Sequence, residues 1–378
     1  MRPVVGEGVT MGRNRVVDSL VLRGARGVGD RAFRCLVDAF GSPGAALDAD
    51  AVALEKNCGA TPALVAALAA CRDLEERARG ALVRVEAAGF TAVAYGQEGY
   101  PERLAAIPDP PSVLYLAGDS SCLAAPAVAV VGSRKASTHG VRFARRLAAD
   151  LAAAGFTVVS GLAQGIDAAA HRGALDVPGG RTVAVFGCGL DVIYPPRHAE
   201  LSVAVRNSGA WVSEFPLGAA PGRHHFPRRN RVISGLTQGV VVVEASDRSG
   251  SLITASCALE QGREVFAVPG LPGSFNAQGA HRLLRDGARL VDSAADVLEE
   301  LGAAPAGAAA GTVADARPEP PAELRPLWKV LEDAPLHIDE LAAAAGVSAA
   351  EASAALMELV LGGYAEQWAG GRFVRTGP

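Results

Sequence analysis

The clearest pattern in the chain is a series of short apolar runs that lack polar alternation and end in small residues. Stretches with helical spacing separate them, among them VRFARRLAADLAAAG and SLITASCALEQG. The runs are AVAVVGS (127–133), TVVSG (157–161), RTVAVFGCG (181–189), AWVSE (210–214), GVVVVEA (239–245), REVFAVPG (263–270) and a shorter ARLV. Strands buried on both faces have this character in parallel sheets covered by helices. The pattern therefore predicts an α/β domain over residues 120–301, with a Rossmann-like, doubly wound and mostly parallel sheet.

Before this domain, residues 1–119 predict small helices and a crossover. A Gly-Val-Gly turn at 27–29 is followed by apolar residues at helical spacing, from Phe33 to Phe40. The segment resembles a helix-hairpin-helix or SAM-like module. The turn has two readings, a tight turn between helices and a set of amides presented to a phosphate. The proline-rich stretch GYPERLAAIPDPPSVLYLAGD is expected to lead into the next domain.

After it, residues 302–321 are rich in Ala, Pro and Gly without an apolar period, which predicts a linker. Residues 322–378 predict three helices and a β-hairpin, the plan of a winged helix. Ser348 is a good N-cap for the third helix. That helix, SAAEASAALMELVLGG, has two glutamates and no Lys or Arg. Since a helix that reads the major groove should be basic, this module is expected to dock proteins or the rest of the chain.

Charge and cysteine usage narrow the possible functions. The net charge is −4, so binding to a polyanion must come from a local cluster. The six cysteines are scattered without a CxxC pair, which favours reduced thiols in a cytoplasmic protein and argues against zinc. No apolar run reaches the ~18 residues that a membrane helix needs, and a signal-peptide layout is absent. We therefore expect a cytoplasmic protein with no membrane partner and no bound metal.

Small, hydroxyl and basic residues follow the predicted strands. In an open parallel sheet the ligand binds at the carboxyl ends of the strands. Because these residues follow the strands in the chain, we expect them to lie together along that end of the sheet, which we call the rim. Ser-Gly-Ser before a helix presents free amides to an anion, although an ordinary N-cap explains it equally well. Gly-Ser-Arg adds a guanidinium that binds phosphate. The rim candidates are Gly132, Ser133, Arg134, Lys135, Gly161, Gln164, Gly165, Ser249, Gly250 and Ser251.

The segment RHHFPRRNRVISG (223–235) lies between the fourth and fifth predicted strands and so reaches the same rim. Arginines around a phenylalanine suit single-stranded nucleic acid, because guanidinium groups follow phosphates and a ring stacks on a base. Arg223 and Phe226 are expected in a loop that contacts the strand. Arg228, Arg229, Asn230 and Arg231 are further candidates. Pairing with Glu214, Glu244 or Asp247 is an equal alternative for Arg229 and Arg231.

Several enzyme signatures are missing from these loops. GxGxxG after the first strand, GxxxxGK[ST] and GxSxG do not occur, which argues against a dinucleotide site, a P-loop and an α/β-hydrolase. Asp167 and His171 are spaced for a pair, expected to be a structural hydrogen bond that holds the second loop. No catalytic residue and no cofactor are predicted.

At these residues the sequence resembles the DNA-processing protein A family. The similar blocks run from VVGSRKAS through VVSGLAQGIDAAAHRGAL, RTVAVFGCGLDVIYPPRHAEL and HHFPRRNRVISGL to VVVVEASDRSGSLITASCALEQGREVFAVPG. They span the whole predicted Rossmann-like domain. The resemblance implies a cytoplasmic homodimer of natural transformation that binds and protects incoming single-stranded DNA and loads RecA recombinase, without catalysis. It assigns DNA contact to Arg134, Arg223 and Phe226. The family's GxN block reads GAH here, so no role carries over to His281.

A competing hypothesis is a phosphoribohydrolase-like enzyme on a related sheet. Such enzymes carry a PGGxGTxxE block whose glutamate lies beside the ribose. The corresponding helix start here, RSGSLITASCALE, lacks the double glycine and has Ala255 and Ser256 after the threonine. This difference favours the DNA-binding hypothesis.

Overall fold

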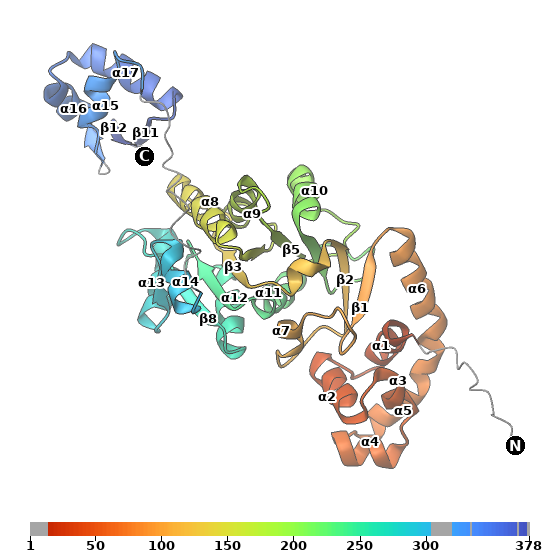
Figure 1. Cartoon of the computed structure of the whole chain (residues 1–378). Helices are drawn as coiled ribbons and strands as arrows, with labels where there is room; N and C mark the ends of the chain where they lie inside the picture. The colour runs from red at the N-terminus through yellow and green to blue at the C-terminus, as the bar shows by residue number, and fades with distance from the viewer. Residues whose placement is uncertain (1–13, 304–319, 333–334, 369, 376–378) are drawn as a thin grey trace, which may run out of the picture. The chain divides into compact units, whose positions relative to one another are not determined.

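The computed structural model describes residues 14–303, 320–332, 335–368 and 370–375 (Figure 1). The chain forms two compact units, Met1–Pro305 and Ala306–Pro378. Each unit is described by itself. Most of the predicted linker lies outside the described residues.

The first unit contains a nine-stranded sheet in the order β1-β2-β6-β5-β4-β3-β7-β8-β9. The seven strands from β6 to β9 are all parallel, as the sequence predicts, while β1 and β2 are antiparallel. The strands are β1 (Thr91–Ala94), β2 (Val113–Gly118), β3 (Ala127–Val131), β4 (Thr157–Ser160), β5 (Thr182–Phe186), β6 (Ala210–Ser213), β7 (Gly239–Val242), β8 (Glu264–Ala267) and β9 (Arg289–Leu290).

The sheet begins earlier in the chain than the sequence suggests. β1 and β2 come from the segment expected to be a helical domain with a crossover, so the sheet does not start at residue 120. The prolines at 108, 110 and 111 lie before β2 rather than in it, which leaves its amides free to pair with β6. The N-terminal helices also share one apolar core with the sheet.

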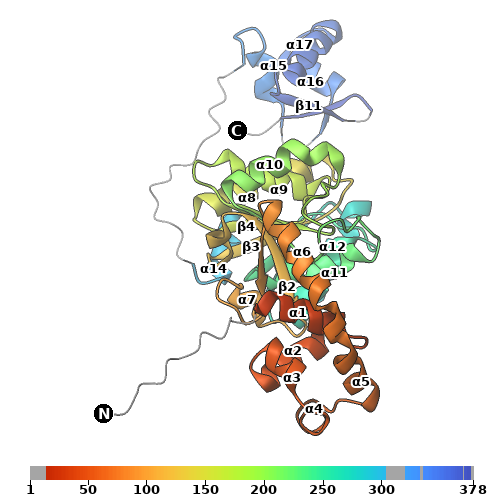
Figure 2. The ribbon, with the colours of Figure 1, turned by 90° about the vertical axis from the view of Figure 1, so that its right-hand side faces the viewer.

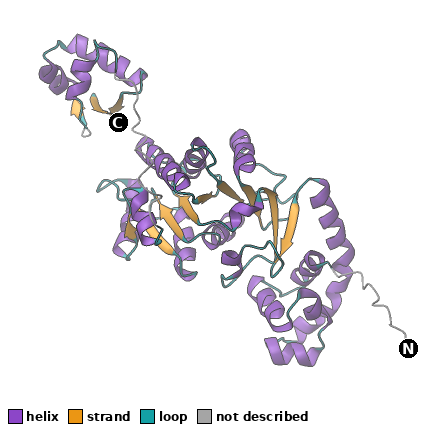
Figure 3. Cartoon of the chain, viewed as in Figure 1, coloured by secondary structure: helices purple, strands orange, loops and turns teal. Residues whose placement is uncertain are grey.

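Helices cover both faces of this sheet (Figures 2 and 3). Val128 and Val130 of β3 face one core with α8 and α9, while Ala129 and Val131 face another with α11 and α12. The N-terminal helices are α1 (Arg15–Gly24), α2 (Asp30–Phe40), α3 (Pro43–Asp48), α4 (Ala51–Cys58), α5 (Pro62–Ala70) and α6 (Glu75–Ala87). The remaining ones are α7 (Glu102–Ala105), α8 (Thr138–Ala153), α9 (Ile166–Asp176), α10 (Ala199–Ser208), α11 (His225–Gly235), α12 (Gly250–Glu260), α13 (Gln278–Arg285) and α14 (Ala294–Glu300).

The Gly-Val-Gly turn joins α1 to α2, with Gly29 as the N-cap of α2. The carboxylate of Asp30, the first residue of α2, pairs with Arg23, Arg228 and Arg231. In this structure the amino end of α2 therefore lies beside the protein's own ion pairs.

The second unit has the winged-helix plan. It consists of α15 (Arg325–Val330), α16 (Ile338–Ala345), α17 (Ala349–Leu361) and a small sheet of β10 (Leu336–His337), β12 (Arg372–Arg375) and β11 (Ala365–Trp368). Ser348 caps α17, and Glu351 completes a capping box, which confirms the predicted helix start.

Within the described residues, no single helix is both long and apolar enough to cross a membrane. Only α16 and α17 together meet that test, and they are bent by 105° relative to each other.

Candidate functional site

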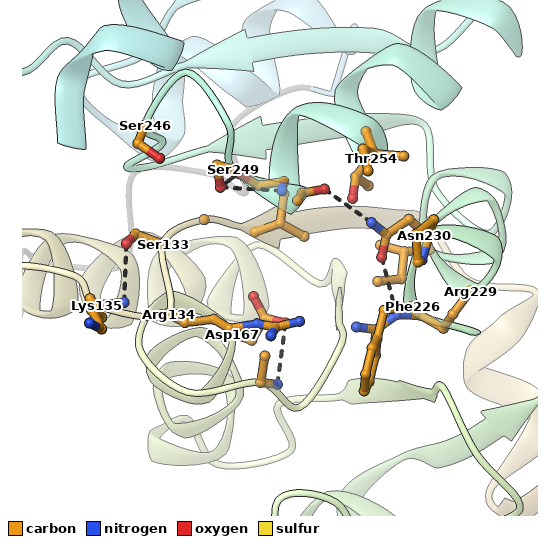
Figure 4. Close-up of a pocket in the computed structure, with 18 of the residues that line it drawn as sticks. Ser133, Arg134, Lys135, Asp167, Phe226, Arg229, Asn230, Ser246, Ser249 and Thr254 are labelled. Atoms are coloured by element: carbon orange, nitrogen blue, oxygen red, sulfur yellow. Dashed lines mark hydrogen bonds between the residues drawn. The ribbon is translucent and has the colours of Figure 1, made fainter. Parts of the chain in front are cut away.

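The loops after β3 and β7 and the start of α11 enclose a cavity of about 660 Å³ at the carboxyl end of the sheet (Figure 4). The structure thus brings together three groups of candidates expected at this rim: the residues after β3, those around the start of α11 and those at the start of α12. The predicted residues that line it are Gly132, Ser133, Arg134, Lys135, Arg223, Phe226, Arg229, Asn230, Ser249, Gly250 and Ser251.

A smaller cavity of about 280 Å³ adjoins the first and shares Arg134, Lys135, Phe226 and Arg229 with it. Gly161 and Gln164 line this second cavity. Gly165 lines neither of them. Its φ is +76°, and a Cβ there would lie 2.3 Å from the carbonyl oxygen of Ser133. Gly165 therefore lets the loop after β4 approach the loop that carries Arg134.

Phe226 lies at the centre of the site and is contacted from two sides. The guanidinium carbon of Arg134 is 5.3 Å from the centre of the Phe226 ring, a cation–π distance. The ring of Tyr194 is 5.6 Å away and tilted. A Cβ on Gly187 would lie 2.9 Å from the Phe226 ring, so glycine at this position makes room for it.

The structure corrects the position of Phe226 in the chain. We expected it in a loop, but α11 begins at His225 and places Phe226 in its first turn. The reason is that Pro227 is compatible with a first helical turn, where its missing N–H has no partner to lose. Arg223 remains in the preceding loop and is exposed.

Arg229 is buried beneath the cavity. Its guanidinium donates hydrogen bonds to the carbonyl oxygens of Gly161, at 2.7 Å, and Val185. Burial lowers the pKa of Arg229 to about 10, and the neighbouring Asp167 opposes that shift. The side chain therefore stays charged at neutral pH. It adds positive charge under the site while fixing the ends of β4 and β5.

Asp167 holds the second loop, as expected, but not through His171. Its carboxylate accepts hydrogen bonds from the amides of Gly161, at 3.2 Å, and Ala163, at 3.3 Å. Burial raises the pKa of Asp167, while the charge of Arg229 opposes the rise. His171 instead contacts Thr182, with 2.7 Å between Nδ1 and Oγ1.

Arg228 and Arg231 lie away from both cavities. Both pair with Glu214, at 2.8 and 2.7 Å, and with Asp30, at 3.1 and 3.2 Å. The Arg231 side chain is only 7% exposed. The sequence left two possibilities for Arg231, contact with a ligand or pairing with an acidic residue such as Glu214. The structure shows the pair with Glu214.

Helices α8 and α12 both begin at this rim, and their amino ends differ in the groups that face them. At α8 the Glu244 carboxylate accepts from the amide of Ser137 at 2.9 Å and from its hydroxyl at 2.5 Å. At α12 the N-cap is Ser249, and Gly250 and Ser251 line the cavity. The carboxylate at α8 repels a phosphate, whereas the amino end of α12 attracts one.

Sequence reasoning did not select several lining residues. Tyr194 follows β5, and Phe275 and Asn276 follow β8. Asn276 links two loops, since its side chain donates to the carbonyl of Lys135 at 3.0 Å and to Glu244 at 3.2 Å. Phe275 is 70% exposed. The rule that strand ends share one rim already points to Tyr194, and following it further into the loop after β8 would have found Phe275 and Asn276.

The histidines near the site have other contacts. His225 stacks on Phe215 with ring centres 4.2 Å apart, and His281 bonds the carbonyl of Gly270 at 2.9 Å. Over the described part of the chain, no group of three or more His, Cys, Asp or Glu side chains is placed to hold a metal ion.

The fold and the site define a class of protein. It is a Rossmann-like α/β protein in which arginines, hydroxyl groups and aromatic rings line a cavity at the carboxyl end of the sheet, and a winged helix follows later in the chain. Two family models match it, DNA recombination-mediator protein A at residues 91–302 and the DprA winged helix domain at residues 312–371. The chain belongs to this DNA recombination-mediator protein A family, whose members are also named DprA or Smf.

Individual relatives agree with this assignment. The chain is 51% identical to Protein Smf of Escherichia coli over 54% of each chain, so the match spans about half of that protein. It is 37% identical to Protein Smf of Synechocystis over 73% of this chain and 78% of the relative. The X-ray structure of DNA processing protein A from Streptococcus pneumoniae matches with a TM-score of 0.67 and 34% identity, over 76% of this chain and 99% of that one.

A second solved structure describes the single-stranded DNA binding mode of DNA processing protein A from Helicobacter pylori. It matches with a TM-score of 0.51 and 28% identity, over 56% of this chain and 95% of that one.

Proposed function

We propose that this protein binds single-stranded DNA in the cavity at the carboxyl end of the sheet. The observation that carries the proposal is Arg134 lying 5.3 Å over the Phe226 ring, in a cavity that Lys135, Arg223 and the amino end of α12 also line. Cationic side chains neutralise phosphates, and a partly exposed ring stacks on a base. Neither contact depends on the identity of the base, so binding should tolerate any sequence. Because the phosphate contacts are electrostatic, the affinity should fall as the salt concentration rises.

The candidates then divide by location. The candidates that line a cavity and are proposed as contacts are Gly132, Ser133, Arg134, Lys135, Gln164, Arg223, Phe226, Ser249, Gly250 and Ser251. Gly161 also lines a cavity, but its amide and carbonyl oxygen are bonded to Asp167 and Arg229, so it is proposed to hold the loop. Residues that are buried or paired within the protein are proposed to position those contacts: Gly165, Arg228, Arg229, Asn230 and Arg231.

The wider role follows from the family. We infer that the protein protects incoming single-stranded DNA and loads RecA recombinase on it during natural transformation or homologous recombination, acting in the cytoplasm without catalysis. Membership of a recombination-mediator family supports this inference. So does the Helicobacter pylori relative, which is described as binding single-stranded DNA.

The central test is Arg134→Ala. Loss of one phosphate-binding cation should weaken single-strand affinity about tenfold, ~1.4 kcal/mol, and lower the slope of log affinity against log salt by about one. Fluorescence anisotropy with a labelled oligonucleotide at several salt concentrations measures both. Arg146→Ala is the matched control, because its side chain on α8 is 84% exposed and lines neither cavity. Unchanged affinity in Arg134→Ala would remove the site assignment.

The absence of catalysis is tested separately. Purified protein incubated with nucleoside monophosphates should release no free base. Release that follows the protein through purification would favour the phosphoribohydrolase-like alternative.

We also propose a homodimer formed through one of the two edges of the described sheet. Both residues of the edge strand β9 are exposed, and Leu290 is 54% exposed, whereas β1 at the other edge is partly buried. An unpaired edge with an apolar side chain favours pairing with another strand, here β9 of a second copy. Leu290→Arg should shift the protein toward monomer in sedimentation velocity, since it places a desolvated charge in the contact. An unchanged dimer would contradict this interface.

A further inference from the structure

Two cysteines lie side by side on adjacent helices of the first unit, in a region that the DNA cavity does not use. Cys35 is exposed in the middle of α2, and Cys58 is the half-buried last residue of α4. The Cys58 thiol donates a hydrogen bond to the carbonyl oxygen of Cys35 at 3.6 Å and also interacts with the Cys35 thiol itself. Cys71, Cys122 and Cys188 instead bond to backbone carbonyls near them in the chain.

We propose that Cys35 and Cys58 form a redox modification site, which hydrogen peroxide converts to a disulfide between α2 and α4. In the first step the Cys35 thiol releases its proton, the thiolate attacks one peroxide oxygen, and the O–O bond breaks. Cys35 becomes a sulfenic acid, and the departing hydroxide takes up the released proton to form water. In the second step the Cys58 sulfur attacks the Cys35 sulfur and displaces its hydroxyl, which leaves as water with the Cys58 proton. Two thiols lose two electrons, and one peroxide gains them and becomes two waters.

The surroundings of the two thiols assign the order of events. Cys35 is the exposed partner and meets peroxide first. Burial, followed by the hydrogen bond and the charge of Cys35, raises the pKa of Cys58 to about 11. Cys58 is therefore protonated at neutral pH and reacts slowly with peroxide, because the thiolate is the reactive form. Its place beside Cys35 makes it the resolving thiol.

The local fold permits the bond to close. The two sulfur atoms must approach to about 2.0 Å. α4 ends at Cys58, and Gly59 follows with a φ of 60°, so the shift falls at the last residue of a helix and not in its interior. Phe33 and Leu36 of α2 and Leu54 of α4 belong to the same core, which keeps the helices adjacent.

The test uses the full chain, peroxide, and N-ethylmaleimide to block the remaining thiols. Intact mass and peptide mapping should show the loss of two hydrogen atoms and a Cys35–Cys58 cross-linked peptide, both reversed by dithiothreitol. In Cys58→Ser the resolving thiol is missing, so Cys35 sulfenic acid should accumulate and be captured by dimedone. Cys257→Ser is the matched control and should leave the cross-link intact, since Cys257 is also half-buried but lies on α12.

Three results would overturn the proposal. One is dimedone capture at Cys35 that is as strong in the unmodified chain as in Cys58→Ser. Another is a disulfide that joins Cys35 or Cys58 to a different cysteine or to a second chain. The third is peroxide oxidation that reaches Cys257 before Cys35.

Discussion

Arg134 and Arg229 have the same side chain and opposite surroundings. Arg229 is enclosed, with its guanidinium on two carbonyl oxygens and beside Asp167, and burial lowers its pKa to about 10. Arg134 extends into the cavity over the Phe226 ring. A guanidinium held by the protein's own carbonyl oxygens is less available to a phosphate than one that extends into the cavity. Burial therefore separates the arginines that shape the site from those available to a ligand.

His171 yields a prediction about acid stability. It is fully buried, and Thr182 donates its own hydroxyl proton to the carbonyl of Val158, so the imidazole Nδ1–H is the donor to Thr182. Burial, aided by the nearby charges of His198, Arg229 and Arg172, lowers the pKa of His171 from 6.5 to about 3. Between those pH values the unfolded chain binds a proton that the folded chain does not. The free energy of unfolding should therefore fall with decreasing pH, by about 1.4 kcal/mol per pH unit from this group.

The measurement compares urea unfolding of the original chain and His171→Gln from pH 7 to pH 4. The glutamine amide can still donate to Thr182, so the variant should fold and show a shallower pH dependence. Identical slopes for the two proteins would show that His171 does not titrate as its burial indicates.

Helix α11 connects the cavity to the N-terminal helices. Phe226, Arg229 and Asn230 line the cavity, while Arg228 and Arg231 share the carboxylates of Asp30 on α2 and Glu214 after β6. Burial raises the pKa of Glu214, and the two arginines oppose that rise. The wall of the cavity is thus held in place by a cluster of charges that is largely out of solvent.

Asp30→Asn tests this connection. Arg23, Arg228 and Arg231 lose a shared, mostly buried carboxylate, so the protein should be destabilised by about 1–3 kcal/mol, and the amides of α2 should exchange faster with deuterium. Glu75→Gln is the control, because it breaks an exposed pair with Arg79 in the same group of helices, which is worth less than about 0.5 kcal/mol. Equal effects from the two substitutions would mean that the cluster does not anchor α2.

At the scale of the whole molecule, the chain divides into two units, and the first of them carries the cationic cavity. The second unit has its own core, which includes Leu327, Leu341 and Leu356. Its α17, the helix that reads DNA in many winged helices, carries Glu351 and Glu358 and no Lys or Arg, and Leu361 on it is 80% exposed. An acidic, partly apolar helix repels a phosphate backbone and suits a protein partner.

The corresponding prediction concerns duplex DNA. A fragment of residues 306–378 should show no binding to duplex DNA at physiological salt in an anisotropy titration, and removing it should leave the single-strand affinity of residues 1–305 unchanged. Circular dichroism of the fragment confirms that it is folded. Duplex binding by the folded fragment would contradict a protein-docking role for this module.

The sequence alone predicted the parallel strands of the sheet, the winged helix and half of the residues that line the larger cavity. Each of these follows from local patterns: continuous apolar runs, helix caps such as Ser348, and the rule that parallel strands end at one rim. That rule brought Arg134, Phe226 and Ser249 together from three separate stretches of chain, which follow β3, β6 and β7. It required no knowledge of side-chain contacts, because topology alone fixes the edge on which those loops lie.

Only the tertiary structure decided which of these residues face the cavity and which are paired within the protein. Arg228 and Arg231 meet Asp30 across 198 and 201 residues of chain, and Glu244 reaches Ser137 across 107. Hydrophobic periodicity along the sequence cannot predict such pairs, because they depend on how the helices pack once the sheet has formed. The same packing added β1 and β2 to the sheet and brought the Cys58 thiol against Cys35. The sequence determined where the chemical groups gather, and burial and long-range charge pairing determined which of them remain available.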